Sequence, residues 1–200
     1  VPRICDTSSL KINMGKNGNV FVTVGTTSFD ELIEAMDSID VIETLKARGY
    51  DSLFIQRGRG AYEPKHIISS SHSCSSEISK KFTKKKKKNE NEFVISIVDF
   101  LPSLDKVLKE ASLVISHAGA GSVFEALSMN KPTLVVVNET LMHNHQVELA
   151  ETLADLGHVA WTKPKDILQA LNAFDSSKLV KYAQGTCTLA KDIENFVFNS

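Results

Sequence analysis

The sequence has 200 residues, of which 42% are hydrophobic and 24% charged, and its formal net charge is −1. These values are typical of a globular domain and exclude a wholly disordered chain. Residues 77–92 hold seven lysines and three glutamates, a local charge of +4 that leaves −5 on the rest of the chain. A nucleic-acid-binding protein spreads positive charge over a folded face, so this distribution argues against a nucleic-acid partner.

The cysteines Cys5, Cys74 and Cys187 are odd in number and widely spaced. This spacing fits neither a secreted disulfide framework nor a zinc knuckle. No apolar run approaches the roughly 18 residues that cross a bilayer, and residues 1–18 lack the apolar stretch of a signal peptide. We therefore expect a soluble, cytoplasmic chain in which residues 1–18 form a loose extension before the folded part.

Short apolar runs alternate with helical patterns along the chain. Most of these runs are continuous in apolar residues, as in strands that are covered on both faces. The predicted strands are 19–24, 52–56, 93–98, 113–116, 133–137 and 158–161.

The helices between these strands have recognisable ends. Ser28 and Glu31 match a capping box, and Gly49 should end that helical stretch about twenty residues later. Further helices are predicted from Pro102 to Ala111, after the glycines at 119–121, from Asn144 to Leu156, and over an amphipathic pattern at 189–197.

Alternation of strands and helices predicts parallel strands joined by crossover helices. We expect a single α/β domain of Rossmann type with a mostly parallel sheet over residues 19–200. The Ser/Lys-rich stretch 69–92 cannot bury apolar surface and is predicted to be a disordered insertion. It is either a solvated loop or a tether to an anionic membrane surface, where each lysine contributes about 1 kcal/mol.

Three predicted connections contain hydrogen-bonding residues where a parallel sheet binds ligands, at the carboxyl ends of its strands. They span residues 24–28, 116–122 and 138–146. In the second connection, Gly119 and Gly121 let the backbone approach a ligand and adopt conformations closed to other residues. Free N–H groups at the following helix start favour an anion such as a diphosphate. A tight turn with no ligand is the alternative.

Glu125 is predicted to lie one helical turn after this connection. A carboxylate in that position reaches a ribose diol while backbone amides hold the phosphates. The alternative is an exposed glutamate on a helix surface, which is common in globular proteins.

Other ligand classes fit the sequence less well. Phe124 stands where the dinucleotide fingerprint needs a third small residue, although Glu139 lies at the spacing of its acidic residue. No Gly-Lys-Ser/Thr triplet marks a phosphate loop of nucleoside triphosphatases. His143 and His145 have no third metal ligand nearby. On the residues alone a dinucleotide site therefore stays a weak alternative, and the two histidines are more often polar loop residues.

Four stretches together resemble a known family. They are Phe21–Asp30 (FVTVGTTSFD), Gln56–Gly60 (QRGRG), Leu113–Ser122 (LVISHAGAGS) with Glu125, and Asn144–Gln146 (NHQ) followed by Glu148–Ala150. They resemble the cytosolic catalytic subunits of the eukaryotic UDP-N-acetylglucosamine transferases that add the second sugar to the dolichyl-linked oligosaccharide precursor. These subunits are similar to the donor-binding C-terminal half of bacterial lipid-linked-intermediate glycosyltransferases of the GT-B fold. The resemblance covers 19–68 and 93–160.

The resemblance implies a role for each matching residue. Gly25, Thr26 and Thr27 would lie on the cleft side of the donor phosphates, and Arg57 would contact a phosphate or the uracil side. Glu125 would bind the uridine ribose. The diphosphate would be held by His117, Gly119, Ala120, Gly121 and Ser122, and the hydroxyls of N-acetylglucosamine by Asn144, His145 and Gln146. Arg57 is otherwise a surface charge. His117 is a candidate catalytic base, and an acidic residue on a partner is the alternative. The resemblance also implies neither a metal nor a cofactor, because the helix dipole and backbone donors can stabilise the departing UDP.

Length bears on the partner. A GT-B enzyme closes two Rossmann-like domains over its substrates, and 200 residues build only one. The resemblance implies a membrane-anchored acceptor-binding subunit that forms a heterodimer with this chain at the cytosolic face of the endoplasmic reticulum. The reaction would transfer N-acetylglucosamine from UDP-N-acetylglucosamine to N-acetylglucosaminyl-diphosphodolichol and invert the configuration at its anomeric carbon. Another UDP-sugar GT-B transferase and a non-catalytic nucleotide-binding module remain alternatives.

Overall fold

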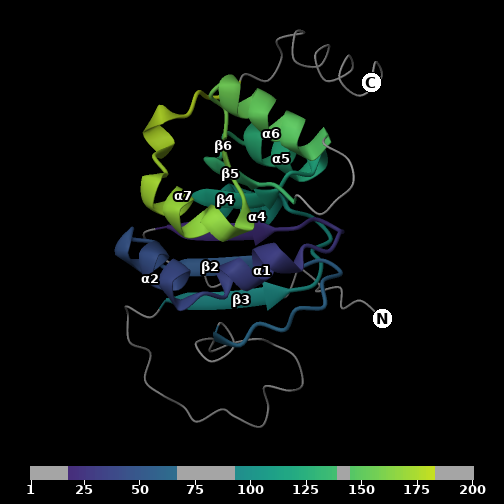
Figure 1. The fold of residues 1–200 in the computed structure, drawn as a ribbon, viewed down its shortest axis with the longest axis vertical. Coiled ribbons are helices and arrows are strands. Elements are labelled where there is room, and N and C mark those ends of the chain that lie inside the picture. The colour runs from purple at the N-terminus through teal and green to yellow at the C-terminus, as the bar shows by residue number, and fades with distance from the viewer. Residues whose placement is uncertain (1–17, 67–92, 139–144, 183–200) are drawn as a thin grey trace.

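The computed structural model describes residues 18–66, 93–138 and 145–182. In these residues, six parallel strands form one sheet (Figure 1). The strand order is β3-β2-β1-β4-β5-β6, and every pairing between neighbours is parallel. This confirms the predicted α/β domain of Rossmann type. The strands are β1 (Asn19–Thr23), β2 (Ser52–Gln56), β3 (Val94–Val98), β4 (Leu113–His117), β5 (Thr133–Val136) and β6 (Ala160–Thr162).

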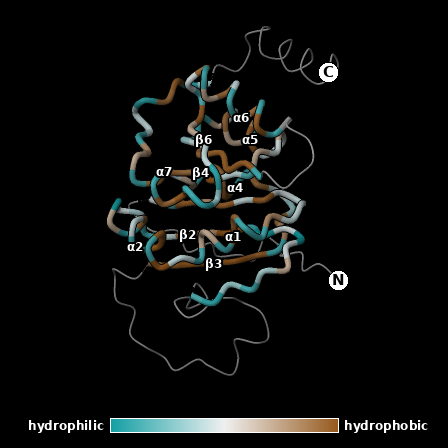
Figure 2. The backbone as a smooth tube through the Cα atoms, in the orientation of Figure 1, coloured by the Kyte–Doolittle hydropathy of each residue, from teal (hydrophilic) through white to brown (hydrophobic). Residues whose placement is uncertain are grey.

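The central strands are buried along their whole length, which explains their apolar sequences. Every residue of β1, β2, β4 and β5 is buried. Successive side chains point to opposite faces, so Val20 and Val22 join one core cluster and Phe21 joins another. Figure 2 shows these strands as hydrophobic segments in the interior.

Helices cover both faces of the sheet. On one face, α1 (Asp30–Met36), α2 (Ile39–Ala47) and α7 (Ile167–Ala173) supply Leu32, Leu45 and Leu171 to the largest core cluster. The opposite face packs against α4 (Asp105–Glu110), α5 (Ala120–Ser128) and α6 (His145–Asp155). Two single-turn 3-10 helices, η2 (Pro164–Asp166) and η3 (Ser176–Lys178), flank α7.

The helical stretch after β1 differs from its prediction. It is two helices, broken at Asp37 and Ser38, and the N-cap of the first is Phe29 with no side-chain cap hydrogen bond. The predicted capping box at Ser28 is therefore wrong. At the break, Ser38 has an extended backbone, and the buried Asp37 carboxylate accepts hydrogen bonds from the Tyr62 hydroxyl and the His66 backbone at 3.0 Å.

Two predicted helix ends are confirmed. Gly49 has a φ of +85° and ends α2, and Gly157 has a φ of +76° and ends α6. Both positions need the left-handed conformation that glycine adopts without steric cost. The predicted strand at 158–161 lies two residues later than expected, and the other strand limits shift by one residue at most.

Some predictions concern residues outside the described ranges. These are residues 1–17 of the loose extension (1–18), the whole Ser/Lys-rich insertion (69–92), the cap of α6 at Asn144 and the amphipathic pattern at 189–197.

Candidate functional site

The strand order places two of the three predicted connections side by side. β1 and β4 are neighbours, and the chain leaves β1 for α1 on one face and β4 for α5 on the other. The point where such connections diverge opens a crevice at the carboxyl ends of the strands, where open α/β sheets bind ligands. The connections 24–28 and 118–119 meet at this switch point (Figure 1).

The β1–α1 connection is fixed by its own hydrogen bonds. Gly25 has a φ of +63°, and its N–H bonds to the Thr23 hydroxyl at 3.0 Å. The buried Gln56 side chain donates to the Gly25 carbonyl at 3.0 Å. The Thr27 hydroxyl donates to the Val24 carbonyl at 2.9 Å. Thr26 and Thr27 are nevertheless exposed, so this connection offers a rigid polar edge to the crevice.

The start of α5 has the features of an anion site. Its N-cap is Gly119, no side chain caps it, and its first turn contains no acidic residue. The first intrahelical bond that involves Gly119 comes from Val123, so the N–H groups of Ala120, Gly121 and Ser122 have no partner within the helix. The positive end of the helix dipole adds to the attraction for a negative group.

The glycines of this connection act differently from the prediction. Gly119 has a φ of −83° and Gly121 lies within the helix, so neither uses a backbone conformation closed to other residues. That part of the prediction is wrong. A Cβ at Gly119 would overlap the His117 ring, whereas a Cβ at Gly121 would meet nothing within 4 Å. Packing requires the first glycine, and the second leaves open space before the helix start.

His117 is the last residue of β4, and its ring lies beside Gly25 of one connection and Gly119 of the other. Its side chain is buried, and burial lowers the pKa of the imidazole, an effect that a hydrogen bond with the Thr23 backbone opposes. Nδ1 is buried without a hydrogen-bond partner. A Cβ at Gly25 would lie 2.8 Å from Cε1 of this ring and 3.5 Å from Oγ of Ser122. The two connections are therefore in direct contact through His117 and Ser122.

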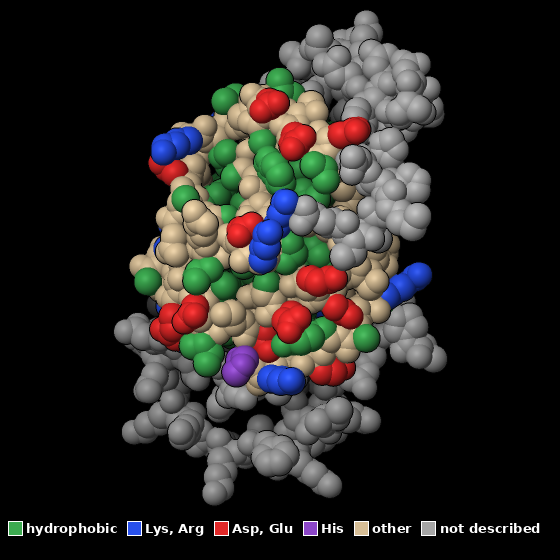
Figure 3. All heavy atoms as spheres, viewed as in Figure 1, with side chains coloured by type: hydrophobic (Ala, Val, Ile, Leu, Met, Phe, Trp, Pro, Cys, Tyr) green, Lys and Arg blue, Asp and Glu red, His purple; other side chains and the backbone are tan. Residues whose placement is uncertain are grey.

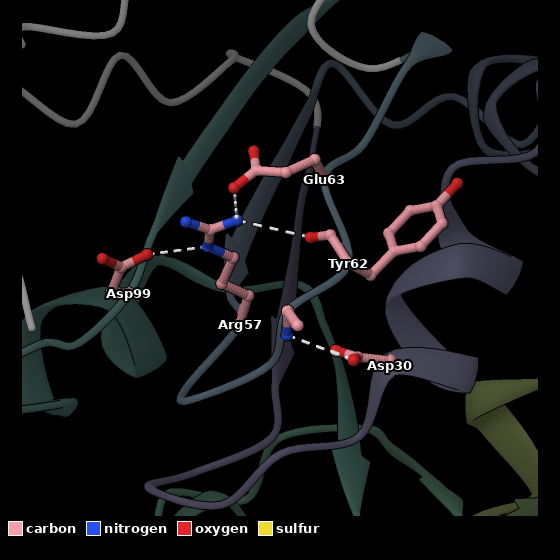
Figure 4. Close-up of polar contacts among 6 residues, drawn as sticks. Asp30, Arg57, Tyr62, Glu63 and Asp99 are labelled. Carbon is pink, nitrogen blue, oxygen red and sulfur yellow. Dashed lines mark hydrogen bonds and ion pairs between the residues drawn. The ribbon is translucent and has the colours of Figure 1, made fainter.

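Arg57 is held by carboxylates (Figure 4). Its Nε donates to Asp99 at 2.7 Å, and one terminal nitrogen donates to Glu63 at 3.1 Å and to the Tyr62 carbonyl at 3.3 Å. Burial of Arg57 would lower its pKa, but the bonds to Asp99 and Glu63 outweigh it and raise the pKa. The structure thus gives Arg57 a role in tying the chain after β2 to the end of β3.

Glu125 lies where it was predicted, one turn into α5. Its side chain is exposed and has no hydrogen bond or ion pair with the described residues. The carboxylate is therefore available to a ligand bound at the start of the helix.

The third predicted connection is only partly described. Residues 139–144, which include Asn144, lie outside the described ranges, and the side chain of His145 does too. Gln146 lies in the first turn of α6, and its side-chain oxygen is buried with no hydrogen-bond partner. A buried, unpaired acceptor is uncommon in proteins. Its position in this connection is consistent with the predicted contact to a polar ligand.

A pocket of about 390 Å³ lies beside the crevice, between α1 and η2. Phe29, Ala35 and Pro164 give it an apolar floor, and charged side chains of both signs surround it. Figure 3 shows acidic side chains gathered over the region of α1 and α2 on the viewed face. This agrees with the net negative charge of the sequence outside residues 77–92.

Residues 18–66, 93–138 and 145–182 contain neither a cluster of metal ligands nor a helix that could span a membrane. No group of three or more His, Cys, Asp or Glu side chains is arranged to hold a metal ion. Within the same ranges, the helices are too short or too polar to cross a bilayer.

The sequence prediction missed the residues that support the site. Gln56 and Gly58 belong to a stretch that resembles the family, and no local pattern singles out Asp99. Gly58, two residues after β2, does carry a signal, because an isolated glycine beside a strand often marks a close backbone approach. It has a φ of +64°, and a Cβ there would overlap the Thr27 carbonyl oxygen.

Comparison with known proteins gives the family. A model described as the glycosyltransferase family 28 C-terminal domain matches residues 19–197. The chain is 32% identical over 196 residues to the UDP-N-acetylglucosamine transferase subunit ALG13 of Kluyveromyces lactis, covering 92% of this chain and 98% of that protein. It is 36% identical over 168 residues to the Homo sapiens protein of the same name, covering 84% of this chain. It spans only 13% of the human protein's length and 10% of that of the Mus musculus relative.

Solved structures share the fold. An NMR solution structure of ALG13 superposes with a TM-score of 0.63 at 24% identity and covers 92% of this chain and 98% of that chain. The crystal structure of Acinetobacter baumannii MurG superposes with a TM-score of 0.53 at 19% identity, over 82% of this chain and 43% of that chain. The fold is thus that of one domain of a GT-B glycosyltransferase. The chain belongs to the glycosyltransferase family 28 C-terminal domains and, within them, to the ALG13 subunits of UDP-N-acetylglucosamine transferase.

Proposed function

We propose that this chain is the donor-binding half of a two-chain glycosyltransferase. It binds UDP-N-acetylglucosamine, and N-acetylglucosamine is transferred to N-acetylglucosaminyl-diphosphodolichol. The observation that carries the proposal is the meeting of the connections after β1 and β4 at the switch point, with an uncapped α5 beside them. This arrangement suits a diphosphate, and the ALG13 relatives name the donor nucleotide sugar.

The donor would lie along the start of α5. The N–H groups of Ala120, Gly121 and Ser122 would bind the diphosphate, which Gly121 leaves room to approach. Glu125 would bind the ribose, and Gly25, Thr26 and Thr27 would form the opposite wall. Asn144, His145 and Gln146 would bind hydroxyls of the sugar.

The same groups account for catalysis. As the bond between the anomeric carbon and the diphosphate breaks, negative charge grows on the departing UDP, and the helix dipole with its free N–H groups stabilises that charge. The acceptor hydroxyl attacks the anomeric carbon from the opposite face, and the configuration inverts. Its proton passes to a base. His117, neutral because of its lowered pKa, is the candidate on this chain, and an acidic residue of the partner is the alternative.

The acceptor half would come from a second, membrane-anchored chain. This chain supplies one Rossmann-type domain, while MurG, whose fold it shares, is more than twice as long as the matched part. Holding both reactants in line accounts for roughly 7–11 kcal/mol of a reaction barrier, so a donor half alone should transfer at a negligible rate. Such a partner would recruit this chain to the cytosolic face of the endoplasmic reticulum.

A transfer assay tests the proposal. The purified chain is incubated with UDP-N-acetylglucosamine and a lipid-diphosphate-linked N-acetylglucosamine, with and without the membrane-anchored acceptor subunit. We expect transfer only with both chains. Robust transfer by the isolated chain would contradict the two-chain arrangement. UDP binding without transfer in the reconstituted pair would favour a non-catalytic nucleotide-binding module. Transfer from a different UDP-sugar would instead favour another UDP-sugar transferase of the GT-B fold.

A further inference from the structure

The turn Gly58–Arg59–Gly60 is tightly packed on both sides of the arginine, and at Gly58 the obstacle is backbone. A Cβ at Gly58 would overlap the Thr27 carbonyl oxygen, and one at Gly60 would overlap a carboxylate oxygen of Asp30. Gly58 also has a φ of +64°, which disfavours any other residue. The turn is therefore pressed against the β1–α1 connection and the start of α1.

Backbone hydrogen bonds fix the turn at the carboxyl edge of the sheet. Arg59 N–H donates to the Thr27 carbonyl at 2.8 Å, and Gly58 N–H donates to the Asp99 carbonyl at 3.0 Å. Arg57, directly before the turn, is anchored to Asp99 through its side chain (Figure 4). The backbone of Arg59 is thus positioned beside the exposed Thr26 and Thr27.

The side chain of Arg59 has no partner among the described residues, although hydrogen bonds fix its backbone. It is exposed and forms no hydrogen bond or ion pair with the described residues, whereas Arg57 is engaged by two carboxylates. No ion pair joins Arg59 to the nearby Asp30, whose carboxylate accepts a hydrogen bond from the Ala61 N–H at 3.1 Å. Holding the backbone of a charged residue rigid while leaving its guanidinium free favours a ligand of opposite charge.

We propose that Arg59 binds a diphosphate in the crevice at the carboxyl edge of the sheet. A guanidinium matches phosphate oxygens with paired donors and is always charged. Contacts link the turn to the start of α5, because Gly58 packs on the Gly25 carbonyl and Gly25 packs near Ser122. The inference rests on the proposed function, which brings two diphosphates to this edge, that of the nucleotide donor and that of the lipid-linked acceptor.

The test compares Arg59→Gln and Arg59→Lys with Lys178→Gln, a charge-matched control on the exposed η3. Calorimetry with UDP measures donor binding to the full chain. Steady-state kinetics of the reconstituted two-chain enzyme measure KM for the lipid-linked acceptor and for the donor. Thermal unfolding checks that each variant is folded, and we expect no change there, because the Arg59 side chain has no partner to lose.

A donor contact predicts that Arg59→Gln weakens UDP binding about tenfold or more, as the loss of a charge-assisted hydrogen bond does. An acceptor contact predicts unchanged UDP binding and a similar rise in KM for the lipid-linked acceptor alone. Arg59→Lys should retain part of the effect, and Lys178→Gln should match the wild type. Wild-type values for Arg59→Gln in both assays would overturn the inference while the proposed function stands. Absence of UDP binding and transfer in the wild type would instead overturn the proposed function and this inference with it.

Discussion

The imidazole of His117 lies directly against Gly119, so closely that a Cβ at Gly119 would overlap Nε2. The next glycine, Gly121, lies two residues later and faces open space. Two glycines of one connection therefore differ in their surroundings. The first lets a buried side chain pack, and the second leaves open space beside the start of α5.

This difference predicts the effect of adding one methyl group to each position. Gly119→Ala should lower the free energy of unfolding by roughly 1–3 kcal/mol, the usual cost of overpacking. Removing the ring in a His117→Ala, Gly119→Ala double variant should cost less than the sum of the two single changes. Denaturant unfolding of the three variants measures this coupling. Additive effects would show that the ring is not the obstacle.

Gly121 should respond in the opposite way. Gly121→Val should change stability by no more than about 1 kcal/mol, because a Cβ at this exposed position meets no neighbour within 4 Å and helix propensity is the main change. UDP binding should nevertheless be lost, since the new side chain fills the space before the free N–H groups of α5. Calorimetry gives both binding and stability. A variant that binds UDP like the wild type would remove the diphosphate site from this helix start.

Glu125 is predicted to act on ligand affinity alone. Glu125→Gln should weaken UDP binding by roughly 1.5–3 kcal/mol, the contribution of hydrogen bonds to a charged group. The folded chain should keep its stability, because the side chain has no partner among the described residues. Glu151→Gln, an exposed position on α6, is the matched control. Equal UDP affinities in the two variants would make Glu125 an ordinary surface residue.

The ion pair of Arg57 and Asp99 should stabilise the fold of the β2–β3 side. Both side chains are about four-fifths buried, and the 2.7 Å bond joins their charged groups. Arg57→Met and Asp99→Asn should each cost roughly 1–3 kcal/mol, with less-than-additive loss in the double variant. UDP affinity should fall only if loss of the ion pair also disturbs the Gly58–Gly60 turn. A double-mutant cycle with no coupling would contradict the interaction.

The lowered pKa of His117 predicts a contribution to acid sensitivity. Burial keeps the ring neutral in the folded chain, while the unfolded chain protonates it near its ordinary pKa of 6.5. Unfolding then takes up a proton, so the free energy of unfolding falls as the pH drops below that value. His117→Asn should reduce the slope by up to about 1.4 kcal/mol per pH unit. Parallel curves of the free energy of unfolding for the wild type and the variant, between about pH 5 and about pH 7, would contradict this prediction.

The layered fold could be predicted from the sequence because it follows from short-range patterns. Continuous apolar runs such as 19–24 and 113–116 mark strands covered on both faces, and Gly49 and Gly157 mark helix ends. The same patterns also locate the connections after β1 and β4, which carry the candidate site.

What could not be predicted depends on contacts between distant residues. The Asp37 side chain at the helix break is bound by Tyr62 and His66, more than twenty residues later. Arg57, a candidate ligand contact or a surface charge by its sequence, bonds to Asp99, forty-two residues away. A single sequence shows neither partner, because nothing in the local pattern marks which carboxylate a loop arginine will meet.

The anchoring of the chain on either side of residues 67–92 has a consequence for that stretch. His66 N–H is bound by the Asp37 carboxylate at 3.0 Å, and Val94 N–H by the Asp51 carbonyl at 3.0 Å. Both anchors are made by described residues, and neither depends on how many residues separate them. We therefore expect that inserting residues or a fused label between His66 and Phe93 leaves the free energy of unfolding of the domain nearly unchanged.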